Sequence, residues 1–136
     1  MSILVFDIES VPDFESGRKV HNLSHDLSDK DVVKAMQHLQ FQKTGSEFMP
    51  LHLQRIVAIS VVFEKGDQLK VWSLGDADAT EKEIIQRFYE GVEQHIPTLV
   101  SWNGNGFDIP VLNYRALLHG IQAVSYTHLR AHETSN

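Results

Sequence analysis

The sequence contains no cysteine among its 136 residues, which excludes disulfide bonds and metal sites built from thiolates. It also lacks an apolar run near the roughly 18 residues of a membrane span, and it lacks the pattern of an export signal. We therefore expect a soluble, cytoplasmic protein with no membrane contact. A chain of this length with 42% hydrophobic residues suffices for one domain that buries most of its apolar surface.

Positive charge is also scarce, because 12 Lys and Arg residues face 18 Asp and Glu residues, for a net charge of −6. A dedicated nucleic-acid binder normally carries a basic surface that neutralises phosphates. An enzyme that processes phosphates can nevertheless be acidic, because divalent cations held by its carboxylates supply the positive charge. The charge balance therefore excludes neither class.

The first half of the chain predicts a strand and a helix. A continuous apolar run predicts a strand over residues 3–8, of the kind that is covered on both faces, and Pro12 ends it. Residues 14–28 are polar and read as irregular. Ser28 then predicts the N-cap of a helix that begins with residues 29–40.

Two β-rich runs follow, and they predict an antiparallel hairpin with strands over residues 54–64 and 68–74. Thr80 and Glu83 then have the spacing of a capping box that opens an amphipathic helix. The apolar residues of this helix are Ile84, Ile85, Phe88, Tyr89 and Val92.

The last part of the chain predicts a buried strand over residues 98–102, a turn over 103–106 and a helix over 109–119. Gly120 supplies the stop signal of this helix. The order of elements predicts an α/β fold with a mixed sheet, in which the late strand lies parallel to the first strand.

Two carboxylates stand two positions apart at the end of the first strand. Because strand side chains alternate, Asp7 and Glu9 point to one side while Ile8 points into apolar packing. A right-handed crossover would bring the end of the later strand beside them, so that Asp108 could face both acids. Three carboxylates suit Mg²⁺ or Mn²⁺ far better than zinc.

Each of these features also has an explanation without function. Asp7 and Glu9 could form an ordinary exposed strand end, and Asp108 could cap the following helix, which stabilises by about 1 kcal/mol. Trp72 and Trp102 lie in predicted strands, where packing is the more common role than base stacking.

Two pairs of histidines have the i, i+4 spacing of zinc ligands on a helix. His21 and His25 form the first pair, but no pattern supplies a third ligand, so we expect solvated side chains. His128 and His132 form the second pair, near the end of the chain.

The motifs FDIES at residues 6–10 and WNGNGFD at 102–108 resemble the first two motifs of the 3′-5′ exonucleases of the ribonuclease-H-like fold, which are named for four acids, D-E-D-D. The resemblance is closest to predicted exonucleases similar to the proofreading domain of family-B DNA polymerases. The runs RIVAISVVF and NGFDIPVLNYRALLHGI also resemble that group, so that the similarity covers most of residues 1–122.

This resemblance implies a ribonuclease-H-like sheet with three antiparallel strands followed by a parallel one, and hydrolysis at the 3′ end of a nucleic acid, for which we expect single-stranded DNA. Asp7 would bridge two Mg²⁺ or Mn²⁺ ions, Glu9 would bind one of them, and Asp108 would hold the second. Three matching positions would contact the substrate strand: Ser10, Asn103 and Phe107. RNA as substrate and association with a polymerase stay open.

The family pattern also requires a fourth acid on a later helix, with a Tyr or His before it, and this sequence has no such pair at that spacing. The ending VSYTHLRAHETSN resembles a translated sequencing adaptor. We therefore expect an incomplete exonuclease domain over residues 1–123, a non-native tail over 124–136, and little activity. An ordinary frayed terminus is the alternative for the tail. The alternative function is a non-catalytic module of the same fold that binds nucleic acid or a protein partner.

Overall fold

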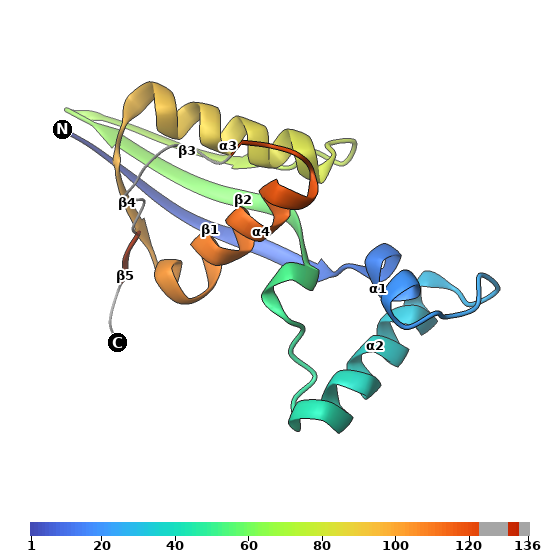
Figure 1. Ribbon diagram of the computed structural model, residues 1–136. Helices are drawn as coiled ribbons and strands as arrows, with labels where there is room; N and C mark the ends of the chain where they lie inside the picture. The colour runs from blue at the N-terminus through green and yellow to red at the C-terminus, as the bar shows by residue number, and fades with distance from the viewer. Residues whose placement is uncertain (123–130, 134–136) are drawn as a thin grey trace. The chain divides into compact units, whose positions relative to one another are not determined.

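The computed structural model of the chain describes residues 1–122 and 131–133 (Figure 1). The chain forms two compact units. Unit 1 comprises Met1–Ser10 and the chain from Ile56 onward, and unit 2 comprises Val11–Arg55. Unit 2 is thus an excursion between the first two strands of the sheet.

One mixed sheet has the strand order β3-β2-β1-β4-β5. β2 and β3 pair antiparallel, whereas β1 with β4 and β4 with β5 pair parallel. The strands are β1 Ser2–Pro12, β2 Gln54–Lys65, β3 Gln68–Leu74, β4 Thr98–Ser101 and β5 Ala131–Glu133. The predicted α/β class with a ribonuclease-H-like mixed sheet is therefore confirmed, and so is the predicted hairpin. The short strand β5 was not predicted from the sequence.

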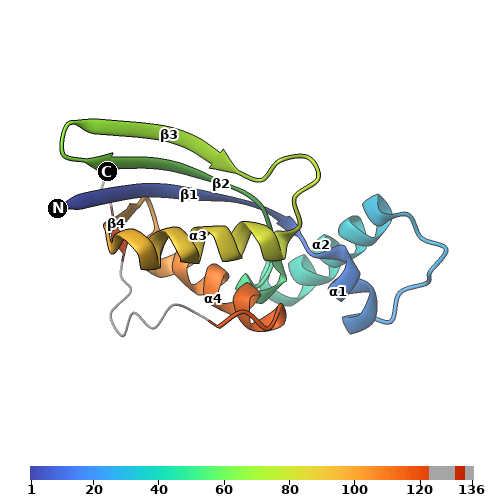
Figure 2. The same cartoon turned by 90° about the horizontal axis from the view of Figure 1, so that it is seen from above.

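Two helices of unit 1, α3 (Glu81–His95) and α4 (Ile109–Leu118), lie on the same side of this sheet (Figure 2). The predicted capping box of α3 is present, and all five of its predicted apolar residues are buried. The ring of Phe88 lies 5.0 Å from that of Phe6 in β1, so the core of unit 1 fills the space between helices and sheet. No helix in the described ranges is long and apolar enough to cross a bilayer.

The other face of β1 is open, contrary to the prediction of a strand covered on both faces. Leu4, Phe6 and Ile8 are buried, whereas the alternate residues Val5, Asp7 and Glu9 are exposed. Four consecutive apolar residues gave no sign of this alternation, since a run without polar residues looks the same for one covered face as for two.

Unit 2 begins with a short helix, α1 (Phe14–Val20), within the segment that the sequence predicted to be irregular. Asp13 starts this helix, because its carboxylate accepts hydrogen bonds from the backbone N–H and the hydroxyl of Ser16 at 3.1 and 2.6 Å. This is a standard N-cap. The helix has only seven residues, too few for an amphipathic pattern to be recognised.

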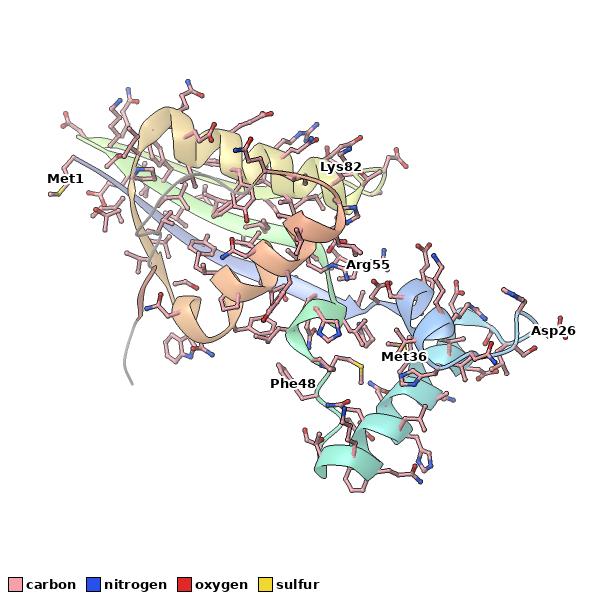
Figure 3. All side chains as sticks on the ribbon, in the orientation of Figure 1. Met1, Asp26, Met36, Phe48, Arg55 and Lys82 are labelled. Carbon is pink, nitrogen blue, oxygen red and sulfur yellow. The ribbon has the colours of Figure 1, made fainter. Side chains whose placement is uncertain are left out.

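The helix predicted after Ser28 is confirmed as α2 (Asp29–Thr44), with the Ser28 hydroxyl accepting from the N–H of Asp31. Gly17 of α1 faces this helix, and a side chain there would overlap the sulfur of Met36 (Figure 3). A glycine in the middle of α1 thus permits the two helices to pack closely. Unit 2 has its own buried cluster, made by Val32, Met36, Met49 and Leu53.

A buried ion pair joins α3 to α4 in unit 1. The Glu81 carboxylate accepts from Arg115 Nε at 2.9 Å and from Arg115 Nη2 at 2.7 Å. It also accepts the backbone N–H of Ile56 at 2.6 Å, and it lies 2.6 Å from His119 Nε2. Arg115 is 2% exposed and Glu81 is 9% exposed. No local pattern in the sequence predicts this pair.

Candidate active site

The open face of β1 carries Asp7 and Glu9 side by side, as the alternation of strand side chains predicts. Hydrogen bonding to the Asp7 carboxyl, repulsion by its charge and slight burial raise the pKa of Glu9 above its ordinary value. The two acids therefore interact strongly enough that adding a proton to Glu9 relieves the repulsion. A cation at this place would relieve the same repulsion.

Asp108 is held in a different environment, at the end of a π-helical turn, Gly104–Asp108. It is 3% exposed, and its Oδ2 accepts a hydrogen bond from the hydroxyl of Ser101. Burial raises the pKa of Asp108, the Ser101 hydroxyl opposes this rise, and the negative charges of Asp7 and Glu9 add to it. The three acids therefore share one electrostatic environment, although they come from chain segments a hundred residues apart.

Asp108 occupies the predicted position directly before α4, but it does not cap this helix with its side chain. Its backbone is already helical, with φ −60° and ψ −50°, and its side chain makes no capping hydrogen bond. A capping residue normally has an extended backbone and accepts an N–H with its side chain. Capping therefore gives no structural reason for a carboxylate at this position.

The predicted turn over residues 103–106 is the start of the π-helical turn. The carbonyl oxygen of Asn103 accepts the N–H of Phe107 at 2.9 Å and that of Asp108 at 3.4 Å. A Cβ on Gly106 would lie 2.5 Å from Oδ1 of Asn103, so the absence of a side chain lets the Asn103 amide lie against the turn. Single π turns within helices often occur at functional sites.

A groove of about 710 Å³ lies on the open face beside Asp7. Twelve residues line it, from β1, β2, β3 and the end of β4, and they include Val5, Val62, Val71 and Trp102. None of the twelve is Lys or Arg. Trp102 is 60% exposed and Trp72 is 40% exposed, so neither is a core residue, whereas packing against a neighbouring strand stays a prediction. No pattern in the sequence predicts this groove.

No group of three or more His, Cys, Asp or Glu side chains is arranged to hold a metal ion within the described ranges. Asp7, Glu9 and Asp108 supply the hard oxygen donors that Mg²⁺ or Mn²⁺ prefers, so the donor set fits such an ion by its chemistry. The side chains do not form a ready-made coordination shell. Their role as metal ligands therefore stays a prediction.

Three of the remaining candidate residues lie within the described part of the chain. Ser10 is partly buried near the end of β1, and His21 and His25 are exposed in unit 2. His128, the side chain of His132 and most of the expected tail over 124–136 lie outside the part of the chain that the structure describes. Their assignments therefore stay predictions.

The comparison with protein families matches residues 46–136, two thirds of the chain, to a family described as predicted 3′-5′ exonuclease related to the exonuclease domain of PolB. The chain belongs to this family. The matched part of this exonuclease-family chain contains the second motif with Asn103, Phe107 and Asp108, whereas Asp7 and Glu9 precede it. A comparison with curated proteins gave no match.

Proposed function

We propose that this chain is a metal-dependent 3′-5′ exonuclease domain in which Asp7, Glu9 and Asp108 hold the metal ions. The observation that carries the proposal is the buried Asp108 carboxylate, which caps no helix and lies in the field of two other acids. Burying an acid among like charges is costly. A divalent cation with oxygen ligands would offset that cost.

The three acids would have separate tasks. Asp7 would lie between the two metal positions, Glu9 would complete one of them and help to position the terminal nucleotide, and Asp108 would complete the other. Mg²⁺ or Mn²⁺, when bound, supplies an activated water and stabilises the leaving 3′ oxygen of the last phosphodiester. Asn103 and Phe107, at the turn that carries Asp108, would shape the groove around the substrate strand.

The groove beside Asp7 supports a single-stranded substrate. Its lining is mostly apolar and includes no Lys or Arg, so phosphates would find no counter-charge there. Unpaired bases can instead lie on valine side chains and stack on an aromatic ring such as Trp102. We therefore propose single-stranded DNA as the substrate class, with its bases in the groove and its terminal phosphate at the acids.

Catalysis by this chain alone should be weak. The sequence contains no Asp after Asp108, so it offers no fourth acid at the family spacing. We propose that three acids suffice for weak metal binding but support little hydrolysis.

A non-catalytic module of the same fold is the second candidate. The observation that favours it is that no group of three acids in the described ranges forms a metal shell. In that case Asp7 and Glu9 would be solvated groups on an exposed strand end, and binding of nucleic acid would not depend on a metal ion. The net charge of −6 argues against tight binding of nucleic acid without metal.

Titration calorimetry with Mn²⁺ tests the proposed site. We expect wild-type protein to bind Mn²⁺ and Asp7→Asn to bind at least tenfold more weakly, because each carboxylate ligand contributes charge. Asp67→Asn, which removes a negative charge from the exposed β2–β3 turn, is the matched control and should bind like wild type. Equal affinity of wild type and Asp7→Asn would refute the site. Binding of a single-stranded oligonucleotide that persists in EDTA would favour the non-catalytic module.

A further inference from the structure

Ser101 is the last residue of β4, it is 1% exposed, and its hydroxyl donates to Oδ2 of Asp108. The π-helical turn makes this contact possible, because it folds the chain back so that the residue seven positions later meets the strand end. Ser101 is buried like Leu99, two positions before it, which places both on the side of the sheet that α3 and α4 cover.

A hydroxyl in this position has a specific use. Burying a carboxylate without hydrogen-bond donors costs several kcal/mol, and within the described ranges Ser101 is the donor that the structure gives to the Asp108 side chain. Hydrogen bonds to ionised groups are stronger and more directional than those between neutral groups. The contact therefore fixes which way the carboxylate of Asp108 points.

We propose that Ser101 is a positioning residue, whose hydroxyl holds Oδ2 of Asp108 so that the second oxygen is presented to a divalent cation. This inference rests on the proposed function. Ser101 itself does not touch the cation. Without its hydroxyl, the carboxylate can rotate, and ordering it again on metal binding costs affinity, typically about 10- to 100-fold for such a supporting hydrogen bond.

Mn²⁺ calorimetry on four proteins tests the role of the hydroxyl: wild type, Ser101→Ala, Ser101→Thr and Ser101→Val. Thr retains the hydroxyl, and Val has nearly the same shape without it. We expect Ala and Val to bind Mn²⁺ at least tenfold more weakly than wild type, and Thr to bind at least tenfold more tightly than Val. Circular dichroism establishes that each variant is folded, and the Thr and Val pair decides the matter if the Ala variant does not fold.

A double-mutant cycle with Asp108→Ala distinguishes positioning from a general effect on the fold. If Ser101 acts through Asp108, Ser101→Ala should not weaken Mn²⁺ binding further in the Asp108→Ala background. An equal loss in both backgrounds, or an affinity of Ser101→Ala within twofold of wild type, would overturn the inference while the proposed site stands. Absence of Mn²⁺ binding that depends on Asp7 in the wild type would overturn the proposed function, and the role of Ser101 with it.

Discussion

Replacing Arg115 by methionine should strongly destabilise unit 1, because it removes the cation from a buried ion pair. The Glu81 carboxylate accepts two of its hydrogen bonds from Arg115, at 2.9 and 2.7 Å. Its other contacts, the N–H of Ile56 and the ring of His119, stay in place. Methionine fills much of the volume of the arginine stem, so the change tests the charge more than the packing.

The size of the effect follows from the burial of both partners. Arg115 is 2% exposed and Glu81 9%, and breaking such a buried pair from one side costs about 3–5 kcal/mol. Since two donors to Glu81 remain, we expect a loss at the lower end, about 3 kcal/mol. Removing both charges in Glu81→Leu/Arg115→Met leaves the buried N–H of Ile56 without its acceptor, which costs about 1–3 kcal/mol, whereas the partly exposed ring of His119 can bind water instead. The double variant should therefore be no less stable than Arg115→Met.

Urea unfolding followed by tryptophan fluorescence measures these free energies. Arg87→Met is the matched control, because Arg87 is an exposed residue of α3, and its replacement should change stability by no more than about 0.5 kcal/mol. A loss below about 1 kcal/mol for Arg115→Met, the range of exposed ion pairs, would refute the reasoning. The reasoning would also be refuted if the double variant lost as much stability as Glu81→Leu and Arg115→Met lose separately, added together.

Two further predictions concern the turn and a buried tyrosine. Gly106→Ala should force the Asn103 amide to rotate, because the new Cβ would lie 2.5 Å from Oδ1 of Asn103. The NMR signals of the Asn103 side-chain NH₂ group should therefore shift, and unchanged signals would contradict this prediction. Burial raises the pKa of Tyr89 to about 12, above the roughly 10 of an unfolded tyrosine, so stability should fall as the pH rises from about 10 to 12. In an absorbance titration at alkaline pH, the ionisation step at the highest pH should belong to Tyr89 and should be missing in Tyr89→Phe. If this last step persists in the variant, it belongs to another tyrosine.

The elements with a local signal could be predicted from the sequence. The capping box of Thr80 and Glu83, the hairpin around Gly66 and the serine cap of α2 depend on residues that are close neighbours in the chain, and all three are present. The openness of one face of β1 could not be predicted, because a run of apolar residues carries no alternation. The pair of Glu81 and Arg115 could not be predicted either, because 34 residues separate two charges that nothing local distinguishes from surface charges.

The acids of the candidate site were found by their spacing and by resemblance, whereas their environment was not. Neither the spacing nor the resemblance indicated that Asp108 would be buried and hydrogen-bonded to Ser101. An acid followed by a helix start that contains proline is also the sequence signal of an ordinary N-cap. The exposure of Trp102 was missed for a related reason, since hydrophobic character alone does not tell the covered face of a strand from the open one. These details depend on which elements cover the sheet.

The π-helical turn has a consequence for how this sequence can vary over evolution. Each residue of a helix turns the chain further around the helix axis, by about 100° in an α-helix and by less in a π turn, so deleting one residue between Gly104 and Phe107 would swing the Asp108 side chain away from Ser101. An insertion would do the same in the opposite direction. The segment between Ser101 and Asp108 should therefore keep its length among relatives that retain both of these side chains, even where the residues within the segment are exchanged. The number of residues between Ser101 and Asp108, more than the identity of those residues, would mark the relatives that share this arrangement.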